Sequence, residues 1–254
     1  RAQSMINTYG IRSMINILIP MAGAGSRFVK EGYSKPKPFI DVNGKPMIIR
    51  VLENLKVNDA RYILIARREH LEAEPHLVQS ISDNFPVEWL TVDQLTEGTA
   101  STVLFARELI NTDVPLLIAN SDQIIDGGLV PFLADAEFRD LDGSILTFID
   151  EERDPKWSFA RINSDSLVVE VKEKSPISEF ATVGIYYFQT GKLFVDAAID
   201  MIVRNDRVNG EFYTCPVYNY VVSQKKRVGI YNVLKSEMHG IGTPSDLEKY
   251  LSEA

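Results

Sequence analysis

A glycine-rich loop follows the first apolar run of the sequence. The run "INILIPM" gives way to "AGAGSRF", where two glycines and two alanines precede a serine and an arginine. Small residues allow close approach to the main chain, and the backbone N–H groups of such a loop can line a concavity that binds an anion. The residues that would surround a phosphate chain are Ala22, Gly23, Ala24, Gly25 and Ser26, with Arg27 beside them. A tight turn explains the same letters equally well, and the spacing matches neither the GxGxxG fingerprint nor a Walker loop.

A basic segment rich in proline comes next. The stretch "SKPKPFIDVNGKP" carries Lys35, Lys37 and Lys45, and its prolines argue against a helix before Pro46. We therefore expect an extended segment in which Lys37 points back at the glycine-rich loop, beside Arg27. The alternative is a basic loop that is simply exposed to solvent. When this segment is considered without the other motifs, its sequence favours that alternative.

Two further polar clusters follow apolar runs in the first half. The letters "NSDQ" place Asp122 where a carboxylate can bind the Mg²⁺ that bridges substrate phosphates, or can instead cap a turn. The letters "DQLTEGT" offer Gln94, whose amide can donate to and accept from a nucleobase edge, and Gly98, where a base can lie against the main chain. The alternative for this segment is a helix start capped by Thr96 or Thr99.

The second half contributes a lysine and a glutamate as candidates. Lys174 closes the charged run "VKEK", and taken alone it is a surface lysine. Glu211 lies in "NGEFY", where we expect a helix to start and an acidic residue suits the helix dipole. The histidines His70, His76 and His239 show no metal-ligand spacing, and we assign them structural or surface roles.

The elements that must position these residues alternate between strand and helix in the first half. Strands are expected over 15–21, 61–67, 86–94 and 114–122, and helices over 45–56, 69–85 and 98–110. In the second half, strands are expected over 143–150, over 159–174 with a turn at "NSDS", over 181–189 and over 227–233. Helices are expected over 191–206, 210–226 and 243–252, the last with a Thr or Ser cap. This order predicts an α/β fold in one domain, a Rossmann-like, mainly parallel or mixed sheet with helices on both faces. Ligands of such sheets bind beyond the carboxyl ends of the strands, where the polar clusters lie.

Composition limits the class of protein. The formal net charge of −8 argues against a nucleic-acid-binding protein, because no basic field replaces phosphate counterions. The single cysteine excludes an intrachain disulfide and fits a reducing compartment, so we expect a cytoplasmic protein. No apolar run approaches the roughly 20 residues of a membrane span. Residues 1–13 lack a signal-peptide pattern, and we expect a cloning remnant or disordered leader there, before a natural start at Met14 and a single domain over 14–254.

Taken in order, these clusters resemble the sugar-phosphate nucleotidyltransferases, which activate phosphorylated metabolites with a nucleoside triphosphate. "AGAGSRF" followed by "KPFIDVNGKPMI" is similar to the family's opening, and this is the most specific match. The later letters "EKSP", "VGIYYF", "GEFY" and "GTPSDL" resemble its sugar-phosphate and closing motifs, so that the likeness covers about 14–250. The resemblance implies transfer of a nucleotidyl group with release of pyrophosphate, for surface-polysaccharide assembly such as that of a capsule.

The resemblance also implies roles for the nucleotide side of the site. The backbone of residues 22–26 would hold the triphosphate, Arg27 would neutralise the departing pyrophosphate, and Lys37 would contact phosphate near the reacting centre. Gln94, Gly98 and Thr99 would bind the base, and this arrangement favours CTP or UTP over GTP or ATP. With CTP as the substrate, the enzyme would be a cytidylyltransferase.

For the acceptor and the metal, the resemblance implies that Lys174 grips the acceptor's phosphate, with Gly184 and Glu211 against the rest of it. Asp122 would bind Mg²⁺ as the cofactor. Many relatives carry an aspartate as second metal ligand two residues before the closing "GT", but Gly240 stands there in this chain. The acceptor could accordingly be a phosphorylated sugar, alcohol, polyol or amino-acid derivative.

Two other classes of protein compete with this interpretation. A glycosyltransferase of related fold would bind a finished nucleotide sugar through an Asp-x-Asp motif, but "NSDQ" supplies one aspartate of the two. A silent nucleotide sensor would not require Arg27, Lys37 and Lys174. The aromatic runs "VGIYYF" and "CPVYNYVV" are expected in the core, where an exposed part of either could instead form a homodimer surface.

Overall fold

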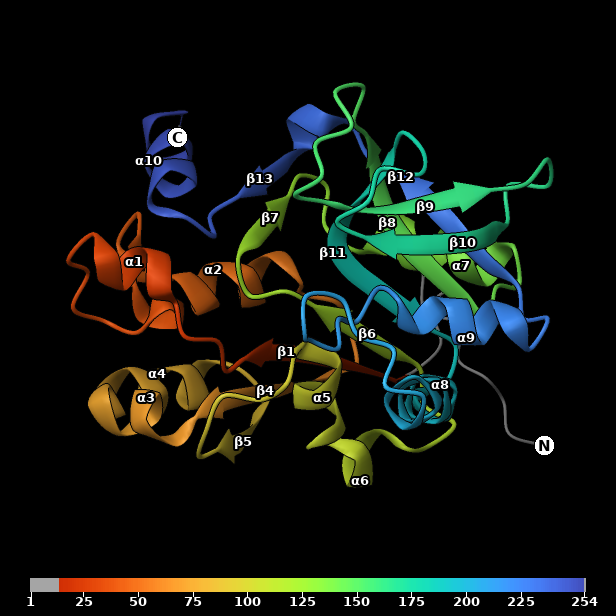
Figure 1. Cartoon of the computed structure of the whole chain (residues 1–254). Helices are drawn as coiled ribbons and strands as arrows, with labels where there is room; N and C mark the ends of the chain where they lie inside the picture. Colours follow the sequence, from red (N-terminus) through yellow and green to blue (C-terminus); the bar gives the residue numbers. More distant parts are fainter. Residues whose placement is uncertain (1–13, 254) are drawn as a thin grey trace.

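A computed structural model describes residues 14–253 (Figure 1). Its strands are β1 (Ile15–Met21), β2 (Asp41–Val42), β3 (Lys45–Pro46), β4 (Ala60–Arg67), β5 (Val87–Val92), β6 (Leu116–Ala119), β7 (Gln123–Ile125), β8 (Gly143–Ile149), β9 (Ser158–Ile162), β10 (Val168–Glu173), β11 (Phe180–Phe188), β12 (Val228–Asn232) and β13 (Met238–Gly240). Its helices are α1 (Ser26–Lys30), α2 (Met47–Asn54), α3 (Arg68–Ala73), α4 (Pro75–Asn84), α5 (Thr99–Leu104), α6 (Arg107–Ile110), α7 (Val130–Phe138), α8 (Gly191–Val203), α9 (Val217–Ser223) and α10 (Pro244–Glu253), with 3-10 turns η1 (Lys37–Phe39) and η2 (Lys235–Glu237). The expected leader over 1–13 lies outside the described residues.

A mixed sheet runs through the molecule. Its strand order is β10-β9-β11-β6-β1-β4-β5, with β8 joined to β11 and β12 joined to β8. The first-half strands β6, β1, β4 and β5 pair in parallel, whereas β11 is antiparallel to β6, β8 and β9. The predicted mixed α/β sheet is confirmed, and the carboxyl ends of β1, β4, β5 and β6 meet at one edge.

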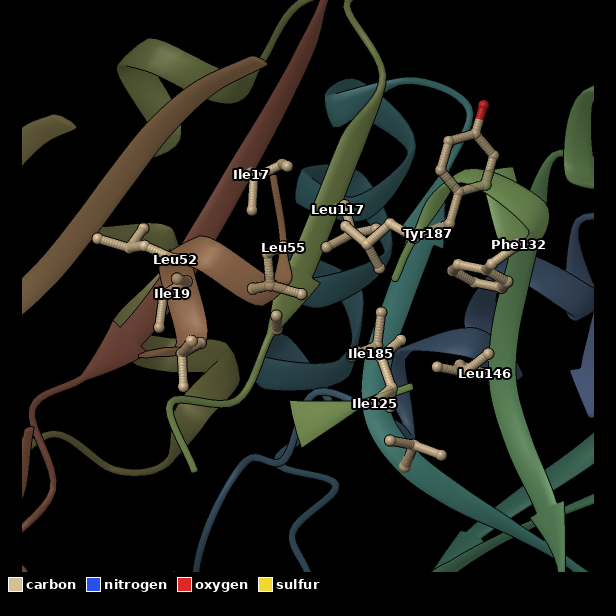
Figure 2. Close-up of a cluster of buried hydrophobic side chains, with 14 of the residues drawn as sticks. Ile17, Ile19, Leu52, Leu55, Leu117, Ile125, Phe132, Leu146, Ile185 and Tyr187 are labelled. Carbon is tan, nitrogen blue, oxygen red and sulfur yellow. The ribbon is translucent and has the colours of Figure 1, made fainter. Parts of the chain in front are cut away.

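Helices cover both faces of the sheet because successive side chains of each strand point to opposite sides. Ile17 and Ile19 of β1 pack with α2, α4 and α7, whereas Leu18 between them packs with α5, α8 and α9. Figure 2 shows the first of these layers, with Leu52 of α2 beside β1 and Phe132 of α7 further along. Each such buried side chain contributes roughly 1.5–3 kcal/mol to folding, and together they fix the strands that carry the site.

The last helix of the fold packs beside the first one. Ile241 and Leu247 pack against Phe28 of α1 and Met47 of α2, so that α10 lies next to α1 (Figure 1). The Thr243 hydroxyl accepts a hydrogen bond from the backbone N–H three residues on, at 3.1 Å, and caps α10 as expected. This packing brings the closing motif to the edge where the parallel strands end.

The structure divides or shortens three helices that the sequence predicts. The region 69–85 breaks before Pro75 into α3 and α4, and 98–110 breaks into α5 and α6. The helix expected over 210–226 begins only at Val217, directly after Pro216. Most of the runs "VGIYYF" and "CPVYNYVV" is buried, as predicted. Among the helices of residues 14–253, none combines the length and the apolar composition of a membrane-spanning helix.

Candidate nucleotide site

The glycine-rich loop leaves β1 at the carboxyl edge and leads into α1. Gly25 has φ of 60° and occupies the left-handed region, where a side chain would be strained. Its carbonyl accepts hydrogen bonds from the N–H groups of Phe28 and Val29 and so starts the short helix. Arg27 is exposed, with no side-chain partner in the part of the chain that the structure describes. The loop therefore holds its turn internally and leaves the arginine free to reach a ligand.

Lys37 joins this loop to Asp122. The lysine lies on the 3-10 turn η1, and a Cβ placed on Gly25 would lie 3.1 Å from the Lys37 Cβ. The Lys37 ammonium donates to Asp122 Oδ2 at 2.5 Å, with 19% and 28% of the two side chains exposed. The segment is thus not wholly extended, because η1 begins directly after Pro36 and includes Pro38. The prediction that Lys37 turns back toward the loop is consistent with this contact.

The closing motif packs directly on Asp122. The Asp122 carbonyl accepts a hydrogen bond from the Ile241 N–H at 2.9 Å, while Gln123 pairs with Gly240 across β7 and β13. A Cβ added to Gly242 would lie 2.5 Å from Asp122 Oδ2, whereas one added to Gly240 would meet nothing within 4 Å. Gly242 therefore lies in close contact with the Asp122 carboxylate, whereas the position of a Cβ on Gly240 is open.

The donor set suits magnesium only with help from the substrate. Residues 14–253 contain no group of three or more histidine, cysteine, aspartate or glutamate side chains arranged to hold a metal. Asp122 Oδ1 has no partner among these residues, and Mg²⁺ commonly binds through one or two carboxylates plus substrate phosphates and water. Asp122 fits that pattern as the protein ligand.

The segment predicted to bind the base is also a packing surface. Gly98 has φ of 123°, and a Cβ there would lie 2.4 Å from the carbonyl oxygen of Phe212. Phe212 donates its N–H to the Glu97 carbonyl at 2.8 Å and accepts from the Ala100 N–H at 2.9 Å. The contact with the Phe212 backbone by itself requires glycine at position 98. Gln94 is exposed, with no side-chain partner within the described chain.

Neither Thr96 nor Thr99 caps α5. The residue at the cap position is Gly98, and no side chain bonds to the helix N–H groups. The Thr99 hydroxyl instead accepts from the N–H and hydroxyl of Thr214, at 3.2 and 3.1 Å. These bonds attach residues 212–214 to the start of the helix, so capping by Thr96 or Thr99, the alternative interpretation of this segment, is wrong.

Gly184 lies where β11 passes the end of β6. Its φ is 98°, its carbonyl accepts from the Asn120 N–H at 2.9 Å, and a Cβ would lie 2.3 Å from Asn120 Nδ2. Any larger residue would push Asn120 out of place, and Asp122 follows two residues later. Gly184 thus fixes the backbone that leads to the aspartate.

Lys174 and Glu211 are joined by a tyrosine that the sequence did not single out. The Lys174 ammonium donates to the Tyr213 hydroxyl at 2.9 Å, and that hydroxyl donates to Glu211 Oε2 at 2.7 Å. The hydrogen bond to Tyr213 raises the pKa of Lys174 above its ordinary value. Glu211 lies in an exposed turn opposite Val208 and not at a helix start, so that prediction is wrong. No local pattern signals the tyrosine, since Lys174 is 39 positions away.

A second missed residue is Glu173, the neighbour of Lys174. Its carboxylate accepts a hydrogen bond from the Ser158 hydroxyl, and burial raises the pKa of Glu173 above its ordinary value. The two adjacent residues therefore differ in environment, one turned inward and one outward.

Fold and site together define an α/β protein whose polar residues gather at the carboxyl edge of its parallel strands, the place where such folds bind ligands. The family model described as nucleotidyl transferase matches residues 17–247. The chain belongs to that family.

Individual relatives are distant in sequence. The bifunctional protein GlmU of Methanocaldococcus jannaschii is 22% identical over 93% of this chain and 54% of its own length. A mannose-1-phosphate guanyltransferase of Yarrowia lipolytica is 29% identical over 52% of this chain and 36% of its own length. The chain spans about half the length, or less, of these curated relatives.

Solved structures share the fold. A nucleoside-diphosphate-sugar pyrophosphorylase from Vibrio cholerae superposes with a TM-score of 0.77 at 22% identity, covering 93% of this chain and 99% of that one. A Bacillus anthracis protein assigned as a glucose-1-phosphate thymidylyltransferase gives 0.74 at 18% identity, over 94% and 95%.

Proposed function

We propose that this protein transfers a nucleotidyl group from a nucleoside triphosphate to a phosphorylated sugar or related phosphorylated metabolite, releasing pyrophosphate. The observation that carries the proposal is the Lys37–Asp122 ion pair of 2.5 Å, held against Gly25 at the edge where β1 and β6 end. It combines a cation for phosphate with a carboxylate for a metal, beside a loop of small residues.

In the proposed reaction, a phosphate oxygen of the acceptor attacks the α-phosphorus of the triphosphate. A new P–O bond forms as the bond to the β-phosphate breaks, and pyrophosphate carries away the negative charge. The attacking oxygen is already anionic, so positioning and charge neutralisation suffice. Bound Mg²⁺, held by Asp122, would supply part of that neutralisation.

The protein's own cations supply the remainder. Arg27, exposed at the loop, would meet the departing pyrophosphate, and Lys37 would contact phosphate near the reacting centre. Lys174 would hold the acceptor's phosphate, with Gly184 and Glu211 on the acceptor side of the site. A guanidinium suits this task because its donors match phosphate geometry.

For the base, we propose CTP or UTP, bound at Gln94, Gly98 and Thr99. The amide of Gln94 supports a base site at this segment, because it is exposed and can both donate to and accept from a base edge. The relatives' names include both a guanyltransferase and a thymidylyltransferase, so family membership alone does not choose the base. We further propose a role in surface-polysaccharide assembly, in the cytoplasm where nucleoside triphosphates are made.

The test is calorimetric binding of CTP, UTP, GTP and ATP in magnesium buffer, with UDP-glucose as comparison. The variant Asp122→Asn removes the charge at nearly constant volume, and Asp113→Asn, at an aspartate 85% exposed, is the matched control. We expect one triphosphate to bind selectively and Asp122→Asn to weaken it at least about tenfold. Pyrophosphate release with glucose 1-phosphate, mannose 1-phosphate and polyol phosphates then identifies the acceptor.

Two results would overturn the proposal. Binding of UDP-glucose without response to any triphosphate would favour a glycosyltransferase. Triphosphate binding without pyrophosphate release across the acceptor panel would favour a nucleotide sensor.

A further inference from the structure

The chain of hydrogen bonds between Lys174, Tyr213 and Glu211 has one possible direction. An ammonium can only donate and an ionised carboxylate can only accept. The single hydroxyl proton of Tyr213 therefore points at Glu211 Oε2, 2.7 Å away, and an oxygen lone pair faces the Lys174 ammonium at 2.9 Å. Glu211 thus orients the hydroxyl, and the hydroxyl orients the ammonium. One N–H of Lys174 is used and two remain.

The lysine is held from its backbone side as well. Lys174 has φ of 53°, a left-handed conformation that is uncommon for residues other than glycine and costs energy. Glu173 turns inward at the same point and accepts the Ser158 hydroxyl. The strained turn at the end of β10 therefore sets where the Lys174 side chain leaves the main chain, and Tyr213 sets where its ammonium lies.

The two neighbours of Tyr213 are hydrogen-bonded to the segment predicted to bind the base. The neighbour on one side, Phe212, exchanges backbone hydrogen bonds with Glu97 and Ala100, on either side of Gly98. The neighbour on the other side, Thr214, bonds to the Thr99 hydroxyl. Tyr213 is therefore fixed to the start of α5 through both neighbours, so it links the lysine of the acceptor side to the segment of the nucleotide side.

We propose that Tyr213 is a positioning residue that holds the Lys174 ammonium for the acceptor's phosphate, and that Glu211 acts through Tyr213. The proposal rests on the nucleotidyl-transfer function proposed above. It reassigns Glu211 from touching the acceptor to aligning the hydroxyl that aligns Lys174. The two free N–H groups of Lys174 would then meet phosphate oxygens.

Three variants separate this arrangement from direct contact. Tyr213→Phe removes only the hydroxyl, Glu211→Ala removes its acceptor, and Glu211→Gln keeps an oxygen that can accept from the hydroxyl. Tyr220→Phe is the matched control, because Tyr220 donates its hydroxyl to Asp206 on the surface in the same way.

The first measurement does not need turnover. We expect NMR titration of lysines labelled with ¹³C at Cε, with Lys174 assigned by its loss in Lys174→Met, to give a lower Lys174 pKa in Tyr213→Phe. The hydrogen bond to Tyr213 is the largest influence that raises this pKa, and the titratable groups facing Lys174 are the neutral Tyr213 and the carboxyl groups of Glu173 and Glu211. Tyr220→Phe should leave it unchanged. An unchanged pKa in Tyr213→Phe would overturn the hydrogen-bond chain itself.

The second measurement is the kinetics of pyrophosphate release with glucose 1-phosphate and mannose 1-phosphate as acceptors. We expect Tyr213→Phe to raise the acceptor KM about tenfold, with kcat within about threefold of wild type and triphosphate affinity unchanged. Glu211→Ala should match it, Glu211→Gln should recover much of the loss, and Glu211→Ala should add nothing in the Tyr213→Phe background.

Each contrary outcome has its own meaning. Additive effects of Glu211→Ala and Tyr213→Phe would show that Glu211 touches the acceptor directly, and would overturn the reassignment. A lowered Lys174 pKa with unchanged acceptor KM would overturn the positioning role. A lowered pKa in a protein that releases no pyrophosphate would instead sink the proposed function and leave the hydrogen-bond chain intact.

Discussion

The contact between Gly242 and Asp122 gives a sharp test of the candidate metal position. Replacing Gly242 by alanine adds a Cβ that would lie 2.5 Å from Asp122 Oδ2, closer than the 3.0 Å below which real Cβ contacts essentially never occur. Gly242 does not have a left-handed φ, so the backbone accepts alanine and the strain falls on the carboxylate. Gly240 has equally permissive backbone and open space, and Gly240→Ala is therefore the matched control.

The size of the effect follows from the distances. The carboxylate must retreat by about 0.5 Å to reach 3.0 Å, and by about 0.9 Å to reach ordinary contact at 3.4 Å. A misplacement of about 1 Å can cost on the order of 100-fold in rate, so we expect kcat/KM to fall about 10- to 100-fold, or about 1.4–2.7 kcal/mol. Folding should suffer less, because a partly exposed ion pair such as Lys37–Asp122 contributes about 1 kcal/mol or less.

The assay is pyrophosphate release with the triphosphate and acceptor that the experiments under Proposed function identify, together with magnesium-dependent triphosphate affinity and thermal unfolding. We expect Gly242→Ala to lose activity and magnesium dependence, with Tm lowered by no more than about 4 °C. Activity of Gly242→Ala within twofold of wild type would refute the claim that the placement of Asp122 matters. Equal losses in Gly240→Ala would refute the contact argument.

Two further predictions concern folding. Gly98→Ala, with φ of 123° and its Cβ 2.4 Å from the Phe212 carbonyl oxygen, should lower the free energy of unfolding by about 2–4 kcal/mol in urea titration. A loss under 0.5 kcal/mol would mean that the two segments separate freely. Burial, followed by the charge of Arg67, lowers the pKa of His70 below its ordinary value of 6.5. The unfolded chain therefore binds a proton at this histidine more readily than the folded protein does. The free energy of unfolding should accordingly fall as the pH drops below 6.5. Urea midpoints at pH 7.5 and 5.5 should differ more in wild type than in His70→Gln, and equal differences would contradict this.

Local pattern predicted the elements whose signals are local. The strand predicted over 15–21 coincides with β1, and α2 begins directly after Pro46, where the proline and the helical spacing predict a helix. Thr243 caps α10 because its hydroxyl satisfies an N–H only three residues away. These features depend on residues that are close in the sequence, so the local sequence is sufficient to predict them.

Features that depend on distant partners were missed or misread. The stretch from Gly210 has helical spacing, yet α9 starts only after Pro216, because the backbone of Phe212 bonds to residues 97 and 100 and cannot also bond within a helix. Glu211 was misplaced for that reason. No local pattern indicates Tyr213, because its partner Lys174 lies just after the end of β10, 39 positions away.

The single carboxylate at the proposed metal position has a consequence for charge. A Cβ at Gly240 would meet nothing within 4 Å, so the packing leaves room for a side chain to begin there, beside the paired strands β7 and β13. The absence of a second aspartate there leaves Asp122, already paired with Lys37, as the carboxylate that repels an incoming triphosphate at this point. Under the proposed function, that lower negative charge makes binding of phosphate less dependent on metal bound beforehand. If Asp122 holds the metal as proposed, Mg²⁺ would need substrate oxygens for the rest of its ligands, so metal and triphosphate should bind this protein together rather than in sequence.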